Sequence, residues 1–357
     1  MSDKLRVAVI GCGRMGQHYA HVYNTLPDTK LVAIAEYNPT RRQIVGERFG
    51  VKAVYQDAAT LFEEVQPDIA AIVLPGKFIK GAVLAAVAAG VRGVTTDKPI
   101  GALLSDADEM VKACADQGVV FGGGNLQRAM GEVHEAGMWL QNGDFGRLTG
   151  GSVHNWGGEI SGGGCQHISV LRLFAGAEVQ EVTAWATPED VLNGDSDAGL
   201  IVNGRLRMTN GLEVSIFGTK TPFSGVDVWS DNALVRWDWD PPEIYQGFDS
   251  QGRRIRQDRP FTPYEFPEFY YLGTSIRSFI DAVQTGSELW ISGFDLRQAL
   301  EVAIAARNSA RHGNVPTMLP LADRDQTLYP IPYRWDGGDV TDRIQPDLEA
   351  GSPWSGY

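Results

Sequence analysis

Residues 5–16 read Leu-Arg-Val-Ala-Val-Ile-Gly-Cys-Gly-Arg-Met-Gly, an apolar run followed at once by the pattern Gly-x-Gly-x-x-Gly. The apolar run predicts a buried strand, and the next segment, 15–26, predicts a helix. Between such elements Gly11 permits a tight turn, Gly13 lets the backbone approach a pyrophosphate, and Gly16 lets the helix pack closely. The stretch therefore predicts a dinucleotide site at the helix N-terminus, where free N–H groups favour an anion. A glycine-rich turn without a ligand is the alternative.

An acidic residue follows the second predicted strand. Glu36 comes directly after the apolar segment 31–35 and 20 residues after Gly16. A carboxylate there can accept hydrogen bonds from both ribose hydroxyls and repels a 2′-phosphate, which favours NAD over NADP as the cofactor. Arg41 and Arg42 argue the other way, since either side chain could approach a phosphate.

The rest of the chain divides by its hydrophobic pattern. Up to about residue 123, short apolar runs alternate with helical segments, which indicates a parallel sheet covered on both faces. Beyond Gly122-Gly123-Gly124, longer segments alternate apolar and polar residues, as in Leu212–Ile216, and this is typical of an antiparallel sheet with one covered face. These segments are 148–156, 179–186, 200–209, 212–218, 226–230 and 233–239.

The fold class predicted from this pattern is an α/β Rossmann domain followed by an α+β domain with an open, predominantly antiparallel sheet. The expected boundaries are 1–123 for the NAD(P)-binding domain, 124–320 for the substrate and oligomerisation domain, and 321–357 for an extended C-terminal arm. Two helices, at about 268–285 and 294–311, are assigned to the second domain.

Composition excludes several classes of function. The chain carries 31 Lys and Arg against 44 Asp and Glu, a net charge of −13, and it has no basic run, so we expect no nucleic-acid partner. No apolar stretch approaches the roughly 18–20 residues of a membrane span, and the first strand begins too near Met1 for a signal peptide. Three unpatterned cysteines, Cys12, Cys114 and Cys165, suggest neither disulfides nor a metal site. We expect a cytoplasmic protein without a metal or membrane partner.

A second motif follows the fifth predicted strand, where Thr95-Thr96-Asp97-Lys98-Pro99 stands at the carboxyl edge of the sheet. Alone it would be a loop with a solvated lysine. Together with the glycine loop, a strand ending in Pro75 and a helix ending in Ala88-Ala89-Gly90, it resembles the Gfo/Idh/MocA family of oxidoreductases, whose turn is usually Glu-Lys-Pro. Asn125-Leu126-Gln127-Arg128 matches the family's Asn-x-x-Arg-like element. The resemblance covers residues 5–320.

The resemblance implies hydride transfer between a nicotinamide and a carbinol carbon of a sugar, polyol or related compound. Lys98 matches the family lysine that hydrogen-bonds the reacting oxygen, and His167 matches the histidine that acts as acid and base. Expected cofactor contacts are Gly11, Cys12, Gly13, Arg14, Met15, Gly16, Glu36, Tyr37, Arg41, Leu74, Pro75, Asp97, Lys98 and Asn125. Expected substrate contacts are Lys98, His154, Trp156, Gln166 and His167.

The second half departs from the family pattern around the histidine. The family commonly has Asp-x-Gly-x-His-x-x-Asp, but here Gly163 and Val170 replace the two acids. Without a carboxylate partner, the imidazole of His167 would be less basic and less well oriented, and a buried histidine without a catalytic role is the alternative. Glu159 and His154 are candidates for a replacement group. Trp237 and Trp239, expected on one face of a strand, could stack on a sugar or simply pack in the sheet or between subunits.

Two rival functions stay open. A redox-assisted glycoside hydrolase or lyase would oxidise a hydroxyl, eliminate the aglycone and reduce again, recycling its NAD. A non-catalytic sensor would bind the dinucleotide and a partner protein. In each case we expect a homodimer or homotetramer, because an open sheet leaves one face to cover. The aromatic-rich arm, with Tyr329, Tyr333, Trp335, Trp354 and Tyr357, is expected to lie across its own subunit or a neighbour.

Overall fold

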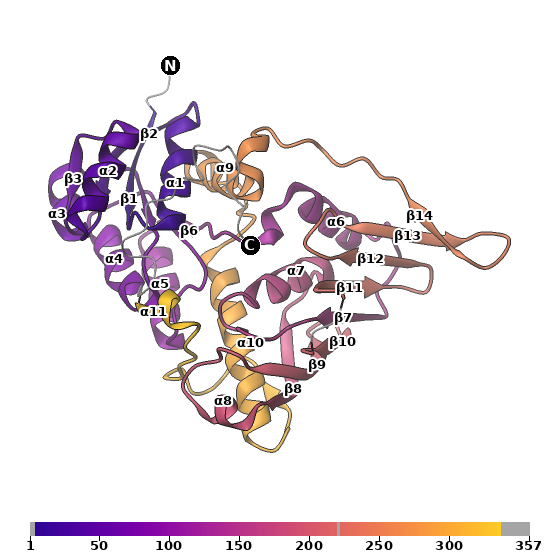
Figure 1. Ribbon diagram of the computed structural model, residues 1–357. Coiled ribbons are helices and arrows are strands. Elements are labelled where there is room, and N and C mark those ends of the chain that lie inside the picture. The colour runs from indigo at the N-terminus through magenta and orange to yellow at the C-terminus, as the bar shows by residue number, and fades with distance from the viewer. Residues whose placement is uncertain (1–3, 220–221, 337–357) are drawn as a thin grey trace. The chain divides into compact units, whose positions relative to one another are not determined.

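The computed structural model describes residues 4–219 and 222–336, which fall into two compact units, each with a sheet of its own (Figure 1). Of the described residues, the first unit contains 4–125, 265–297 and 332–336, and the second contains the remainder. Neither unit is continuous in sequence, whereas the sequence pattern suggested contiguous domains.

The first unit is a six-stranded parallel sheet in the order β3-β2-β1-β4-β5-β6. Its strands are β1 (Leu5–Ile10), β2 (Thr29–Ala35), β3 (Ala53–Tyr55), β4 (Ile69–Ile72), β5 (Gly93–Thr96) and β6 (Val120–Gly122). The helices between them are α1 (Arg14–Thr25), α2 (Pro39–Phe49), α3 (Ala58–Val65), α4 (Gly76–Ala88) and α5 (Leu104–Asp116). This is the doubly wound order, and it confirms the predicted Rossmann fold.

Helix caps explain where two of these helices begin. The side chain of Asn38 accepts a hydrogen bond from the N–H of Arg41, and Pro39 occupies the first position of α2. Asp57 accepts from the N–H of Thr60 at 2.9 Å and so caps α3. The polar residue before each helix thus satisfies an N–H group that has no partner within the helix.

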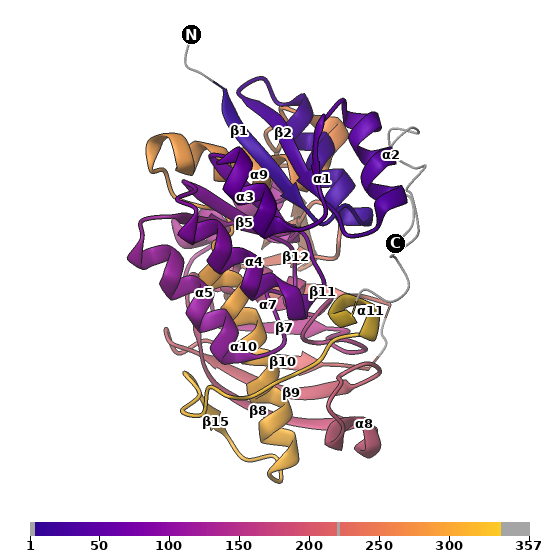
Figure 2. The same cartoon turned by 90° about the vertical axis from the view of Figure 1, so that its left-hand side faces the viewer.

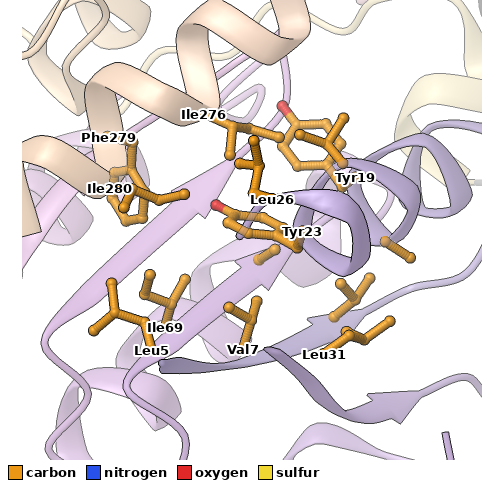
Figure 3. Packing of buried hydrophobic residues seen from close by; sticks show 14 of the residues in the cluster. Leu5, Val7, Tyr19, Tyr23, Leu26, Leu31, Ile69, Ile276, Phe279 and Ile280 are labelled. Atoms are coloured by element: carbon orange, nitrogen blue, oxygen red, sulfur yellow. The ribbon is translucent and has the colours of Figure 1, made fainter. Parts of the chain in front are cut away.

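Helix α9 (Tyr270–Thr285), preceded by the short 3₁₀ turn η2 (Pro267–Phe269), completes the core of the first unit. Figure 3 shows three of its side chains, Ile276, Phe279 and Ile280, directed toward α1 and the strands. A Cβ atom at Gly93 of β5 would lie 2.7 Å from Phe279, so this glycine lets the helix pack on the sheet. The helix was expected in the second domain, because an amphipathic pattern shows an apolar face but does not identify the sheet it covers.

The second unit is built on a nine-stranded mixed sheet in the order β14-β13-β12-β11-β7-β10-β9-β8-β15. All described pairs are antiparallel except β7 with β10. The strands are β7 (Gly150–His154), β8 (Val179–Thr187), β9 (Ile201–Met208), β10 (Glu213–Phe217), β11 (Gly225–Trp229), β12 (Ala233–Trp237), β13 (Glu243–Phe248), β14 (Arg254–Gln257) and β15 (Thr317–Met318). The predicted α+β domain with a predominantly antiparallel sheet is confirmed.

Helices lie on one face of this sheet. Those of the second unit are η1 (Gln127–Ala129), α6 (Gly131–Gln141), α7 (Cys165–Ala175), α8 (Glu189–Asn193) and most of α10 (Gly293–Arg311), within which the chain crosses between units. In β10, Val214 and Ile216 are buried while Glu213, Ser215 and Phe217 are exposed. Helix α7 packs on β11, and Ser309 of α10 accepts a hydrogen bond from the N–H of Ala184 in β8.

The first part of the predicted arm packs on its own chain. Leu321 and Leu328 are buried, and Tyr329 exchanges backbone hydrogen bonds with Asp195 and Asp197 of the second unit. Helix α11 (Pro332–Asp336) then contacts α4 of the first unit. Trp354 and Tyr357 lie outside the described residues. Within those residues, no helix combines the length and the apolar character that crossing a membrane requires.

Candidate functional site

The glycine loop has the geometry that a pyrophosphate site needs. Gly11 has a φ of +88°, and a Cβ atom added there would lie 2.2 Å from the carbonyl oxygen of Val73. A Cβ atom at Gly16 would lie 1.9 Å from the carbonyl oxygen of Gly11, whereas one at Gly13 would meet nothing within 4 Å. Two glycines therefore allow close backbone approach, and the third leaves open space beside the first turn of α1, whose N–H groups have no helical acceptor. These residues fit a dinucleotide.

Glu36 joins this loop to the end of β2. Its buried carboxylate accepts the N–H of Cys12 and the N–H of Asn38, each at 2.9 Å. Arg41 lies 3.5 Å from the same carboxylate, and Arg42 donates to the backbone oxygen of Glu36. Both arginines are thus bonded to Glu36 and are not directed toward a 2′-phosphate. This arrangement favours NAD over NADP. Burial, and then the charge of Glu36, raises the pKa of the Cys12 thiol, so this cysteine is not a nucleophile.

The lysine turn is held by its preceding acid. Asp97 Oδ1 accepts the N–H of Lys98 at 2.8 Å and the N–H of Asn125 at 3.1 Å. Burial raises the pKa of Asp97, and the nearby charge of Lys98 opposes that rise. The Asn125 amide nitrogen lies 4.0 Å from the sulfur of Met15, at the start of α1. The structure therefore brings the lysine turn, the Asn125 segment and the glycine loop to one edge of the first unit's sheet.

Two further predicted cofactor residues border the same edge. Leu74 lies against Gly11, because its Cδ2 would be 2.8 Å from a Cβ atom there, and Pro75 occupies the position just before α4. Tyr37, which follows Glu36, is 62% exposed. The predicted cofactor residues thus come together from segments far apart in sequence.

His167 lies in α7 of the second unit, whereas Lys98 belongs to the first. The imidazole of His167 is buried, and it meets the rings of Trp237 and Trp239 edge-on with centroids 5.8 Å apart in both cases. Neither ring nitrogen has a hydrogen-bond partner by geometry among the described residues. Burial, followed by the charge of His154, lowers the pKa of His167 to about 4, and the backbone of His154 opposes part of this shift. The imidazole is therefore neutral at pH 7.

Glu159 and His154, the two candidates to replace the acid missing beside His167, form hydrogen bonds with other groups. Glu159 accepts the N–H of Gly163 and the N–H of Ile331, each at 3.1 Å. His154 Nε2 lies 2.7 Å from the hydroxyl of Ser152 and 3.3 Å from Asp227. Glu159 thus holds the glycine turn, and His154 bonds side chains of β7 and β11.

Strand register puts the His154 side chain on the other face of the sheet from Trp237. His154, Ser152 and Asp227 share one face, as their side-chain bonds show. Arg236, which bonds Asp227 at 2.7 Å, and the next residue, Trp237, point to opposite faces of β12. Because His167 packs against Trp237, the side chains of His154 and His167 lie on opposite faces of this sheet, and their roles as substrate contacts stay predictions.

The other expected substrate residues hold backbone groups. Trp156 is fully buried and its indole N–H donates to the carbonyl of Gly164 at 3.0 Å. Gln166 accepts the N–H of Gln127 at 2.6 Å. Both side chains therefore stabilise the glycine turn and the segment around it, and their contact with a substrate stays a prediction.

Two features of the second unit do not follow from the sequence pattern. The first is the pair Trp237 and Trp239. Strand β12 ends at Trp237, and Trp239 has a left-handed φ of +64°, yet the centroids of the two rings lie 5.4 Å apart.

The second feature is Asp197, which is fully buried and accepts the N–H of Ser161 at 2.6 Å. Burial raises the pKa of Asp197 to about 6, and the charge of Glu159 adds to the rise. No spacing in the sequence links Asp197 to the glycine turn.

A parallel sheet with the order β3-β2-β1-β4-β5-β6, a glycine loop after β1 and an acid after β2 define a dinucleotide-binding Rossmann unit. Residues 5–124 match the family model GFO_IDH_MocA, described as an oxidoreductase family with an NAD-binding Rossmann fold. This part of the chain therefore matches the family that the sequence resembles, and the match confirms the resemblance and the NAD class of cofactor. Among the described residues, no cluster of three or more His, Cys, Asp or Glu side chains could hold a metal ion.

Known proteins are similar to the chain over different lengths. The myo-inositol 2-dehydrogenase of Thermotoga maritima is 25% identical over 329 residues, which are 85% of this chain and 96% of that protein. The D-apiose dehydrogenase of Paraburkholderia graminis is 28% identical over 150 residues, 42% of this chain, and the match spans only 40% of that protein's length. Levoglucosan dehydrogenase, solved with NADH, matches with a TM-score of 0.75 at 18% identity over 89% of this chain and all of that one. The structural likeness shows the fold.

Replacing Glu36 by Ala should shift cofactor preference toward NADPH. The change removes the carboxylate that would bind the ribose hydroxyls and repel a 2′-phosphate, and it frees Arg41 from its ion pair. Hydrogen bonds to a charged group contribute about 1.5–3 kcal/mol, so the NADPH to NADH ratio of kcat/KM should rise about tenfold or more. Glu47→Ala, at an exposed position in the following helix α2, serves as the control and should leave the ratio unchanged. A ratio unchanged by Glu36→Ala contradicts the assignment.

Acidification should destabilise the protein partly through His167. Its folded pKa of about 4 lies below the ordinary value of 6.5, so between these pH values the unfolded chain binds a proton that the folded chain excludes. Stability is therefore lost as pH falls from about 6.5 toward 4, by up to about 3 kcal/mol from this group. Urea unfolding at pH 7, 5.5 and 4.5 should show a shallower loss for His167→Gln than for wild type.

The exposed His312 provides the control for this experiment. His312→Gln should keep the wild-type dependence of stability on pH, and comparing variants removes the contribution of buried carboxyl groups such as Asp197. Equal pH dependence in wild type and His167→Gln would show that His167 titrates normally in the folded protein.

Proposed function

We propose that the protein transfers a hydride between NAD(H) and a carbinol carbon of a sugar, polyol or related compound. The observation that carries the proposal is the Asp97-Lys98 turn, fastened beside Asn125 at the same sheet edge as the glycine loop. It is supported by the names of relatives, which include myo-inositol 2-dehydrogenase, D-apiose dehydrogenase and, in Escherichia coli, D-glucoside 3-dehydrogenase.

In this proposal the chain's own residues handle the charge on the reacting oxygen. When bound, NAD+ supplies the acceptor for the hydride. The Lys98 ammonium binds the substrate hydroxyl oxygen and stabilises the negative charge that develops on it as its proton leaves. His167 is neutral and so able to accept that proton. The low pKa of His167 makes it a weak base, so the reaction depends more strongly on Lys98 to stabilise the negative charge on the oxygen.

A second candidate function is redox-assisted elimination, in which the cofactor is reduced and reoxidised within one turnover. Two observations favour it. The 2,7-anhydro-N-acetylneuraminate hydratase of Mediterraneibacter gnavus is 26% identical over 141 residues, 40% of this chain and 37% of that protein. In addition, no carboxylate is hydrogen-bonded to the imidazole of His167 among the described residues. This function would release product without accumulating NADH.

Lys98→Ala should reduce kcat/KM for a responsive substrate by about 10²–10³-fold, the usual loss when one group that stabilises an oxyanion is removed. The substrate is found by screening polyols, aldoses and glycosides with NAD+, following NADH absorbance and product formation together. Lys112→Ala, on the exposed face of α5, is the matched control and should retain activity.

The same screen separates the candidate functions. Net NADH formation that depends on Lys98 supports the dehydrogenase, and product release without net NADH supports redox-assisted elimination. A chain that binds NADH, turns over none of the panel and is indifferent to Lys98→Ala would be a non-catalytic sensor. Absence of NADH and NADPH binding below millimolar concentration contradicts the proposal altogether.

We also propose that the protein is a homodimer or homotetramer. The uncovered face of the second unit's sheet exposes two large rings, Trp185 at 51% and Phe217 at 45%, beside the ion pair of Arg205 with Glu213. Pairing of such faces about a twofold axis would bury the rings. Light scattering at micromolar concentration should give two or four times the chain mass of 38.9 kDa. A single chain mass contradicts the proposal.

A further inference from the structure

We propose that helix α11 near the C-terminus forms one wall of the dinucleotide site and that Trp335 contributes directly to NAD(H) binding. The inference rests on the cofactor part of the proposed function and adds a segment that neither the glycine loop nor the family match over residues 5–124 includes. Three observations within the first unit support it.

The first observation is the contact between Trp335 and the start of α4. A Cβ atom at Gly76 would lie 2.8 Å and 3.1 Å from two carbons of the Trp335 ring, and 3.7 Å from the carbonyl oxygen of Arg334. The ring therefore lies directly on the backbone of Gly76, so close that a Cβ atom at this position would displace it. Helix α11 lies beside α4 in both views (Figures 1 and 2).

The second observation is where Gly76 stands in the sheet. It follows Leu74 and Pro75 at the carboxyl end of β4, and Val73 and Leu74 contact the first glycine of the loop, Gly11. The strand order reverses between β1 and β4, and in doubly wound sheets a dinucleotide crosses the crevice at that reversal. Trp335 thus borders the crevice on the β4 side, one residue beyond the expected contact Pro75.

The third observation is the charge near the lysine turn. The guanidinium of Arg334 is close enough to Asp97 to lower the pKa of that carboxyl, in the same direction as Lys98. Asp97 in turn accepts the N–H groups of Lys98 and Asn125. Helix α11 therefore brings a cation to the acid that holds the lysine turn and an aromatic ring to the adjacent helix start. Because Trp335 is only partly buried, the ring has surface left for a ligand.

Calorimetric titration with NADH tests the proposal without relying on catalysis. Trp335→Ala in the full chain should weaken NADH binding about tenfold through loss of the aromatic contact, and Trp335→Phe should keep most of the affinity. Trp139→Ala removes a partly exposed indole from α6 of the second unit and should leave NADH affinity unchanged. Far-UV circular dichroism and melting temperature show whether each variant is folded.

Gly76→Ala approaches the same contact from the other side. The added Cβ atom must displace the Trp335 ring, so NADH affinity should fall by a similar factor even though Trp335 is intact. Gly81→Ala in the same helix is the matched control, because a Cβ atom there meets nothing within 4 Å. The double variant Gly76→Ala/Trp335→Ala should bind NADH no worse than the weaker single variant, since both changes disrupt one contact. Hydrogen exchange of the α11 peptide should slow when NADH binds.

The outcomes separate this inference from the proposed function. If wild type binds NADH and folded Trp335→Ala and Gly76→Ala bind it equally well, with unchanged exchange in α11, the inference is overturned and the proposed function stands. If wild type binds neither NADH nor NADPH, both are overturned. Weaker binding in both variants, with normal binding in both controls, supports the inference.

Discussion

The nucleotide site depends on a backbone crossing that leaves no space for a Cβ atom. Gly16 lies against the carbonyl of Gly11, and Gly11 lies against the carbonyl of Val73. These two approaches fix the distance between α1, the loop after β1 and the end of β4. Cys12 then presents its N–H to Glu36, so the acid that we expect to bind the ribose is held by the glycine loop itself.

Much of the first unit could be predicted from the sequence because its strands are buried on both faces. A run such as Val7–Ile10, apolar throughout and followed at once by a glycine turn, is typical of a strand buried on both faces. Strands β13 and β14 were not predicted, because Glu243–Phe248 and Arg254–Gln257 are largely polar or part-exposed and give no clean alternation. The sequence pattern also did not predict that α9 belongs to the first unit, because the sheet against which an apolar helix face packs is decided by long-range contacts.

The residues of the candidate site also divide into those that the sequence could predict and those that it could not. The positions of Glu36 and Lys98 follow from strand ends, so chain order alone placed them at one edge of the sheet. The environment of His167 does not follow from spacing. The imidazole is buried against Trp237 and Trp239, finds no hydrogen-bond partner by geometry among the described residues, and has a lowered pKa, and these properties depend on segments distant in sequence. Trp156 and Gln166 lie near His167 in sequence, but their polar atoms are used to hold backbone.

The discontinuity of the first unit has a consequence for how the chain is made. A ribosome that has released only residues up to Asn125 has exposed all six strands of the first sheet but not helix α9. Until that helix emerges, Val7, Tyr23 and Ile69 have no Ile276 or Phe279 to cover them. Because domains generally fold as units during synthesis, these first residues must wait as an incompletely covered sheet while eight of the nine strands of the second sheet are translated. An apolar surface of this kind, open for that interval, is what chaperones bind.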